Sequence, residues 1–160
     1  MAAQMRKLAT AIRTDSINLG ETVFFPRTAY VNMKTGEIPA PASDYVDRLI
    51  AFFRLDLAAY HDRLFARAVT TYVRVRANPA DAAWISPGVC ENRIGYWHIQ
   101  GVRLEFIRDS KVVSVAVASL ISWRGIWYVV HLGPNNAPFN VGKVDDYSSG
   151  VGVPGPGGGC

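Results

Sequence analysis

The longest regular pattern in the chain lies between residues 44 and 65, where apolar side chains recur at three- and four-residue steps. This spacing predicts one amphipathic helix, because such residues share a helix face. The apolar face comprises Tyr45, Val46, Leu49, Ile50, Phe53, Leu57, Tyr60 and Leu64. Ser43 or Asp44 can cap its first turn, and Arg48 belongs to the opposite, charged face. We expect the apolar face to cover a sheet.

Directly after this helix the apolar period changes to two, which is the period of a β-strand. Strand-like runs cover residues 69–77, 93–99, 102–107, 111–122 and 125–133. The last four runs are separated by short connections at Gln100–Gly101, Asp109–Ser110 and Arg124–Gly125, and such connections require antiparallel neighbours. The predicted fold class is therefore α+β, with N-terminal helices packed on a four- to five-stranded antiparallel meander. The cone-shaped NTF2-like and cystatin-like folds are one form of this architecture.

The chain has 160 residues, which suits one domain with a buried core. We divide it into an N-terminal helix or flexible segment (1–18), an α+β domain (19–133) and a strap rich in Gly and Pro (134–160). The last segment has no consistent apolar period. Alone it would be disordered, whereas contacts that tie it down would make it an irregular C-terminal strap across the domain.

Composition and motifs exclude several function classes. The formal net charge is +4, but Lys and Arg are scattered singly, which argues against nucleic acid as the partner. No run of 18 apolar residues occurs, so no transmembrane segment is expected. The motifs of nucleotide-binding proteins, zinc proteases and serine hydrolases are missing from the sequence. We predict no cofactor and no metal site, because no spacing brings three or four ligands together.

The two cysteines are Cys90, which precedes the second strand-like run, and Cys160, the last residue. A disulfide between them would close a loop of about 70 residues and stabilise the fold by roughly 4 kcal/mol in the chain-entropy model. The glycines of the tail would let Cys160 reach its partner. The alternative is two unrelated thiols. A bridge would imply an oxidising compartment.

Three segments have distinctive sequences, namely CENRIGYWHIQGVRLEF (90–106), ASLISWRGIWYVVHLG (118–133) and GVPGPGGGC (152–160). They resemble a group of actinobacterial, chiefly mycobacterial, exported or lipoprotein-like proteins of uncharacterised function. The similarity runs from VFFPRTAY (23–30) to the end of the chain. The resemblance implies an extracytoplasmic, cell-envelope location. Members of that group would carry a signal peptide or lipobox, so we expect either that the export signal was removed or that the location is cytoplasmic.

A helix that lies across an antiparallel sheet can enclose a cavity for a small molecule. The side chains that we expect to line it are Tyr96, His98, Arg103, Glu105, Trp127 and His131. The alternative interpretation is that the aromatic side chains fill the core and the polar groups lie outside it. The sequence does not identify which residues, if any, are catalytic.

The function predicted from these observations is a non-catalytic exported domain that binds or scaffolds an envelope component or a small apolar ligand. One alternative is a small carrier or enzyme with an apolar pocket, in which His98 and Glu105 are the polar groups to test. The other alternative is a basic cytosolic protein that binds nucleic acid.

Overall fold

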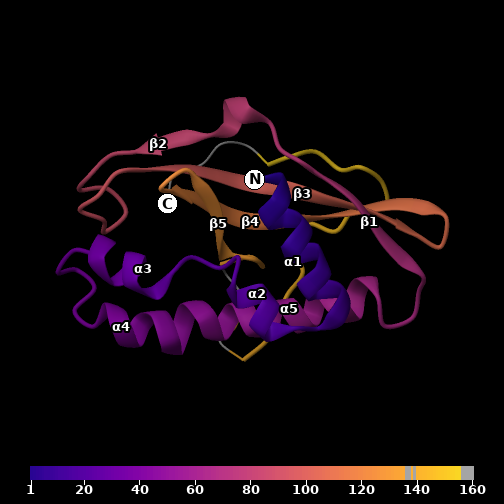
Figure 1. Cartoon of the computed structure of the whole chain (residues 1–160), viewed down its shortest axis with the longest axis horizontal. Coiled ribbons are helices and arrows are strands. Elements are labelled where there is room, and N and C mark those ends of the chain that lie inside the picture. Colours follow the sequence, from indigo (N-terminus) through magenta and orange to yellow (C-terminus); the bar gives the residue numbers. More distant parts are fainter. Residues whose placement is uncertain (136–137, 139, 156–160) are drawn as a thin grey trace.

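The computed structural model describes residues 1–135, 138 and 140–155. Its helices come first: α1 (Ala2–Thr14), α2 (Ile17–Glu21), α3 (Arg27–Met33), α4 (Pro41–Asp44), the π-helical turn η1 (Tyr45–Leu49) and α5 (Ile50–Leu64). The strands are β1 (Thr70–Arg76), β2 (Ala83–Ile85), β3 (Tyr96–Arg108), β4 (Lys111–Trp123) and β5 (Ile126–His131), with a 3₁₀ turn η2 (Pro79–Asp81) before β2. The helices pack against one side of the sheet (Figure 1). The predicted α+β class is confirmed.

The sheet is antiparallel throughout, in the order β1-β3-β4-β5, and β2 pairs with the first residues of β3 beside β1. Two-residue turns join β3 to β4 at Asp109–Ser110 and β4 to β5 at Arg124–Gly125. All four turn residues have positive φ angles, which matches the twist of hairpin strands. Both hairpins were predicted correctly from their short connections.

The prediction of a turn at Gln100–Gly101 is wrong. Gly101 has a φ of 61°, yet pairing with β4 continues on both sides of it, Gln100 with Ser119 and Val102 with Val117. The runs 93–99 and 102–107 therefore belong to one long strand, β3. A glycine inside a strand can take this conformation without ending the ladder. The short strand β2 was not predicted, because its three residues are too few to show a period.

The predicted long helix is present as α4, η1 and α5, which follow one another without a break. Seven of its eight apolar positions are buried, and only Val46 is exposed, at 45%. The predicted cap is wrong, because the helix begins at Pro41 and Asp44 lies inside it. The Asp44 carboxylate instead accepts two hydrogen bonds of 2.7 Å from the Arg48 guanidinium.

The C-terminal segment 140–155 follows the sheet as a strap. Beyond the end of β5, the strap forms hydrogen bonds with the edge of β4 that β5 leaves unpaired. Ala116 N–H donates to Asp145 O at 3.0 Å, and Ser114 and Ser148 exchange backbone hydrogen bonds. Farther on, Gly155 N–H donates to Gly101 O of β3 at 3.0 Å. The strap thereby covers part of a sheet edge whose exposed N–H and C=O groups could otherwise pair with another chain.

Tyr60 connects the helix layer to β4 and to the two segments that pair with the edge of β4, namely the end of β5 and the strap. Its hydroxyl, fully buried on α5, lies 2.7 Å from Ala116 O and 2.8 Å from Leu132 O, and it accepts the N–H of Asp145 at 3.0 Å. One hydroxyl thus contacts backbone groups from β4, from the residues after β5 and from the strap; its single proton is donated to one of the two carbonyls at a time. Backbone groups left unpaired in the interior would each cost free energy.

We expect Tyr60→Phe to lower the free energy of unfolding by about 1–3 kcal/mol, because it removes the hydroxyl that pairs with the buried Ala116 carbonyl and with the Asp145 N–H. Urea denaturation measures the change. The matched control is Tyr72→Phe, since the Tyr72 ring packs edge-on against Phe106 and its hydroxyl has no hydrogen-bond partner among the described residues. The control should change stability by less than about 0.5 kcal/mol. Equal effects of both substitutions would contradict this role of the Tyr60 hydroxyl.

Candidate functional site

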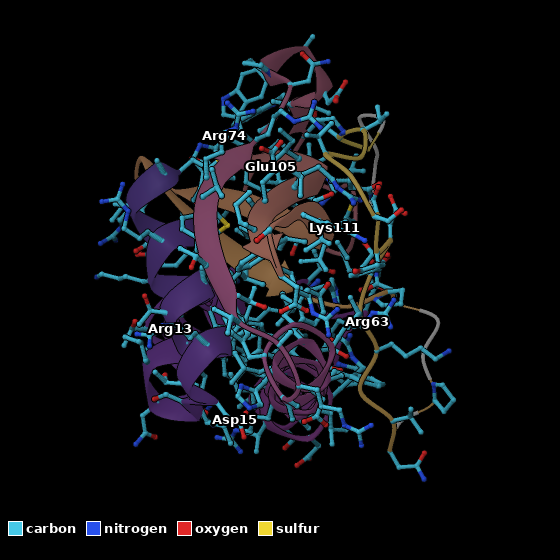
Figure 2. The ribbon with its side chains drawn as sticks, turned by 90° about the vertical axis from the view of Figure 1, so that its right-hand side faces the viewer. Arg13, Asp15, Arg63, Arg74, Glu105 and Lys111 are labelled. Carbon is cyan, nitrogen blue, oxygen red and sulfur yellow. The ribbon has the colours of Figure 1, made fainter. Side chains whose placement is uncertain are left out.

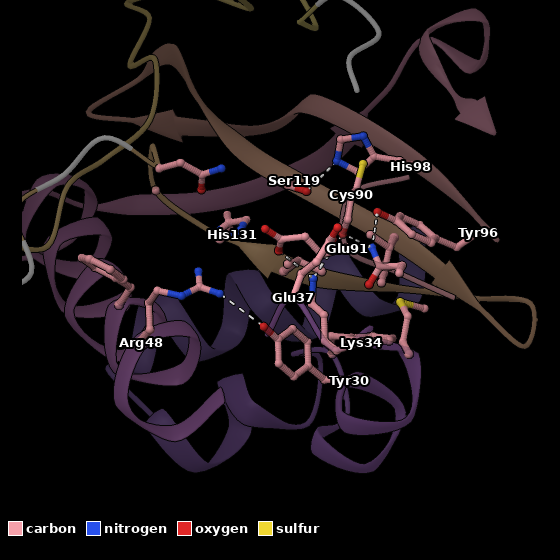
Figure 3. A pocket seen from close by; sticks show the side chains of 18 of the residues that line it. Tyr30, Lys34, Glu37, Arg48, Cys90, Glu91, Tyr96, His98, Ser119 and His131 are labelled. Atoms are coloured by element: carbon pink, nitrogen blue, oxygen red, sulfur yellow. Dashed lines mark hydrogen bonds and ion pairs between the residues drawn. The ribbon is translucent and has the colours of Figure 1, made fainter. Parts of the chain in front are cut away.

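A cavity of about 670 Å³ lies between the helix layer and the sheet (Figure 3). The helices and the segments that join them contribute one wall, while β3, β4 and β5 contribute the opposite wall. The residues on the helix side are Phe25, Tyr30, Met33, Lys34, Glu37, Arg48, Phe52 and Asp56. The sheet residues are Tyr96, His98, Ser119, Ile121, Val130 and His131. Loops on two sides complete the lining with Gly88, Cys90, Glu91, Asn92, Gly133, Pro134 and Asn135. This volume is in the range of cavities that hold small organic molecules.

From α3 and its C-cap, the lining residues are Tyr30, Met33 and Lys34. They lie three and four residues apart and therefore share one face of the helix. Along the continuous helix formed by η1 and α5, the lining residues Arg48, Phe52 and Asp56 follow at four-residue steps. The cavity thus runs beside the apolar stripe of α5 that forms the core.

A hydrogen-bonded network holds Arg48 at the helix wall. Arg48 binds Asp44 through both Nε and Nη2, and Nη2 also donates to the Tyr30 hydroxyl at 3.2 Å. Tyr30 in turn donates to Asp44. The Arg48 hydrogen bonds are the main reason that the pKa of Asp44 is lowered, while burial is the main reason that the pKa of Tyr30 is raised. The charge of Arg48 is therefore largely matched inside the protein.

On the sheet wall, His98 of β3 and Ser119 of β4 are neighbours, with 2.7 Å between His98 Nε2 and Ser119 Oγ. The pairing of β4 with β5 shifts at this place: Leu120 pairs with Val129, whereas Ser119 pairs with His131. Val130 is the extra residue, and both it and His131 line the cavity. A β-bulge of this kind re-aims side chains, which brings His131 to the cavity side of the sheet.

The loop before β3 forms another wall and is tied to the end of α3. Thr35 N–H donates to Glu91 O and Arg93 N–H donates to Met33 O, both at 2.9 Å. Cys90 and Glu91 each have a φ of 57°, an unusual left-handed conformation for two successive residues other than glycine. Such conformations store strain and are common at functional sites.

Asp56 lies at another part of the cavity and is nearly fully buried. Its two carboxylate oxygens accept backbone N–H groups of Gly133 and Lys143, each at 2.9 Å. Burial raises its pKa, and these two hydrogen bonds partly offset that effect. Asp56 thus ties the start of the C-terminal segment to α5, in addition to lining the cavity.

Of the six residues predicted to bind a ligand, Tyr96, His98 and His131 line this cavity. Tyr96 accepts a hydrogen bond of 3.1 Å from the Asn92 side chain. Whether any of the three binds a ligand stays a prediction. Of the two cysteines, Cys90 also lines the cavity, whereas Cys160 lies outside the described residues.

Arg103 and Glu105 are not in the lining, which corrects their predicted place. Successive strand residues face opposite sides of a sheet, so these odd-numbered positions of β3 face away from Tyr96 and His98. Glu105 is buried there and accepts hydrogen bonds of 2.8 Å from Arg74 and Arg76 of β1. Figure 2 shows Arg74 beside Glu105 at the sheet.

The fully buried Arg103 guanidinium is part of the strap's attachment. It donates to Asp146 at 2.6 Å and to Ser114 at 2.8 Å, and Gly152 packs directly against it. Arg76 also donates to the backbone carbonyls of Val151 and Gly152. These arginines and Glu105 hold the strap on the outer face of the sheet, and they do not reach the cavity.

Trp127 was expected on the same side as His131, and this is also corrected. Trp127 pairs with Ser122 of β4, a position adjacent to the cavity residue Ile121 and therefore on the opposite face. The bulge at Val130 breaks the alternation between Trp127 and His131. A sequence shows the period of a strand but not where a bulge interrupts it.

The lining also includes polar residues that the sequence analysis missed, chiefly Tyr30, Lys34, Arg48, Asn92 and Ser119. The steps of three and four residues within α3 could have indicated a shared face for Tyr30 and Lys34. No local signal indicates that the 88–92 loop or Ser119 would lie opposite that face. The pocket is more polar than the apolar one that was expected.

Within the described part of the chain, no group of three or more His, Cys, Asp or Glu side chains is placed to hold a metal ion. Among the same residues, no helix is both long enough and apolar enough to cross a membrane.

The pKa of His131 is lowered to about 4, first by burial and then by the positive charges of Arg48, His98 and Lys34. His131 is therefore neutral at pH 7. Because the unfolded state binds this proton near pH 6.5, stability is lost as the pH falls from about 6.5 to 4.

We expect the His131 imidazole resonances to titrate with a midpoint near 4 in NMR spectra of the folded protein. We also expect His131→Gln to weaken the loss of stability between pH 6.5 and 4.5, as measured by urea denaturation, because the buried histidine no longer takes up a proton on unfolding. A midpoint near 6.5 would contradict the buried, cation-flanked position of this ring.

Comparisons with known protein families, curated proteins and solved structures found no match for this chain.

Proposed function

We propose that the protein is a non-catalytic binding domain that takes a small molecule into the cavity between its helices and its sheet. The observation that carries this proposal is the convergence of three backbone irregularities on one cavity. The π-helical turn η1 contains Arg48, the β-bulge presents His131, and the left-handed pair Cys90–Glu91 forms the loop wall.

Each of these irregularities is less stable than the regular structure that it replaces, and each is common at functional sites. A cavity that only reflected imperfect packing would not require three separate departures from regular backbone around it. Their common location supports a binding role for the space that they surround.

A catalytic role has less support. The hydrogen bond between Ser119 and His98 is the contact that a serine nucleophile makes with its base. However, acyl transfer also needs N–H donors for the developing oxyanion. Ser119 lies in the middle of β4, where it pairs with Gln100, and the N–H of Ala118 donates to Leu132 O. The backbone around Ser119 is thus committed to the sheet.

Filling the cavity tests the proposal. We expect small organic fragments to shift the amide resonances of cavity residues in NMR spectra of the wild-type protein. Ser119→Phe should remove these shifts or weaken binding at least about tenfold, because the ring occupies the cavity.

The matched control is Ser122→Phe, the same change on the same strand at a position that faces the other side of the sheet. It should bind the fragments as the wild type does, and melting curves of both variants show whether they are folded. Fragments that fail to shift cavity amides in the wild type, or that bind Ser119→Phe unchanged, would overturn the proposal.

We further propose that Cys90 and Cys160 form a disulfide and that the protein works in the oxidising cell envelope suggested by the resemblance above. Support comes from the path of the strap. Gly155 lies on Gly101 of β3, three positions from His98, which shares the cavity with Cys90. Five residues separate Gly155 from the end of the chain, and a chain of that length can span at most about 17 Å.

Alkylation tests the bridge. Protein made in an oxidising compartment is denatured without reductant, treated with an alkylating agent and weighed by mass spectrometry. We expect a monomer with no label and a mass two protons below that of the reduced chain, and two labels after reduction. Two labels before reduction would refute the bridge and remove the physical support for an envelope location.

A further inference from the structure

The cavity contains one cation whose partners leave most of its hydrogen-bonding capacity unused. The Lys34 side chain is only 12% exposed. Among the described residues, its ammonium group has Cys90 O at 3.4 Å and a Glu91 carboxylate oxygen at 3.8 Å, and it lies over the Tyr30 ring at 5.1 Å from the ring centroid. Both distances to oxygen are long for a group with three N–H donors, and the ring accepts no conventional hydrogen bond. Arg48, by comparison, makes two hydrogen bonds of 2.7 Å to Asp44.

A buried ammonium group is costly unless an anion or several acceptors surround it. Burial accordingly lowers the pKa of Lys34, and the charge of Glu91 only partly offsets this effect. Glu91 itself is half exposed and lies at the rim of the cavity. The interior of the cavity therefore offers a positive charge that the protein does not fully match.

The opposite wall adds an uncharged hydrogen-bonding group. The His131 ring has no hydrogen-bond partner among the described residues, although it borders the cavity. A neutral imidazole has one N–H donor and one acceptor nitrogen. The charges that act most strongly on this ring are all positive, namely those of Arg48, His98 and Lys34. A negative group placed between the two walls would be stabilised from both sides.

The acidic lining residues are either exposed to solvent or already hydrogen-bonded to the backbone. Glu37 and Glu91 are exposed at the rim, and Asp56 is held by two backbone N–H groups. The cavity therefore has one loosely paired ammonium group and several carboxylates near it, which suits a ligand with one negative charge better than a ligand with two. A phosphate monoester carries nearly two negative charges and is therefore less well suited.

The rest of the lining is suited to an apolar body. Met33 from α3, Phe25 before it, and Ile121 and Val130 from the sheet all face the cavity. An apolar group placed against these side chains would be removed from water.

We propose that the cavity binds a monocarboxylic acid with an apolar body, with the carboxylate between Lys34 and His131 and the body against Met33, Ile121 and Val130. This inference rests on the proposed binding function and names its ligand class. The carboxylate would complete the coordination of the Lys34 ammonium group with a charge-assisted hydrogen bond, which is stronger than one between neutral groups.

The test uses three probes of equal chain length: octanoate, octan-1-ol and octylammonium. Binding is measured from the NMR shifts of cavity amides at concentrations below micelle formation. We expect octanoate to bind at least about tenfold more tightly than octan-1-ol, since a hydrogen bond to a charged group carries that much affinity. We expect octylammonium to bind most weakly.

Lys34→Met keeps a side chain of similar length without its charge. It should weaken octanoate binding about tenfold and leave octan-1-ol binding unchanged. The control is Lys111→Met at the start of β4, outside the cavity lining, which should change neither. A second measurement uses the wild-type protein and so does not depend on whether Lys34→Met folds. Octanoate should raise the pKa of His131 above about 4, because its negative charge favours the protonated ring, and octan-1-ol should not.

The outcomes separate the inference from the function on which it rests. If octan-1-ol or octylammonium binds as tightly as octanoate, or if octanoate leaves the His131 titration unchanged, the acid ligand class is overturned while binding in the cavity stands. If none of the three probes shifts cavity amides although fragments do, the ligand class is overturned as well. If Ser119→Phe binds fragments like the wild type, both proposals fall.

Discussion

The hydroxyl group of Tyr60 occupies the place where four parts of the chain meet. It comes from α5, contacts backbone carbonyls of β4 and of the residue after β5, and accepts an N–H from the strap. At this place β5 leaves the edge of β4 and the strap replaces it. Without a polar group from the helix layer, this exchange of edge partners would leave backbone groups unpaired in the core.

The cavity and the core lie on adjacent stripes of the same helix. Phe53, Leu57, Tyr60 and Leu64 are buried in the core, whereas Arg48, Phe52 and Asp56 face the cavity. Asp56 also binds the backbone of Gly133 and Lys143, so the start of the strap is anchored next to the cavity. The helix that organises the core therefore also positions one wall of the candidate site.

Charged groups were the weakest part of the prediction from sequence, although they are the most informative part of the structure. Arg103 and Glu105 were expected in the pocket, but they attach β1 and the strap to the outer face of the sheet. Arg48 was assigned to a charged outer face, but it binds Asp44 and Tyr30 at the cavity wall. A charged side chain has no periodic signature, so its partner is decided by which segments the fold brings together.

The sequence by itself determined the α+β class, the long helix and the two hairpins at Asp109–Ser110 and Arg124–Gly125. Periodicity and turn geometry act over a few residues, so these elements can be read locally. Only the tertiary structure decided that β3 continues through Gly101, that a bulge turns His131 toward Ser119, and that Lys34 lies opposite that wall. These features depend on strand register and on contacts between distant segments, which no local pattern specifies.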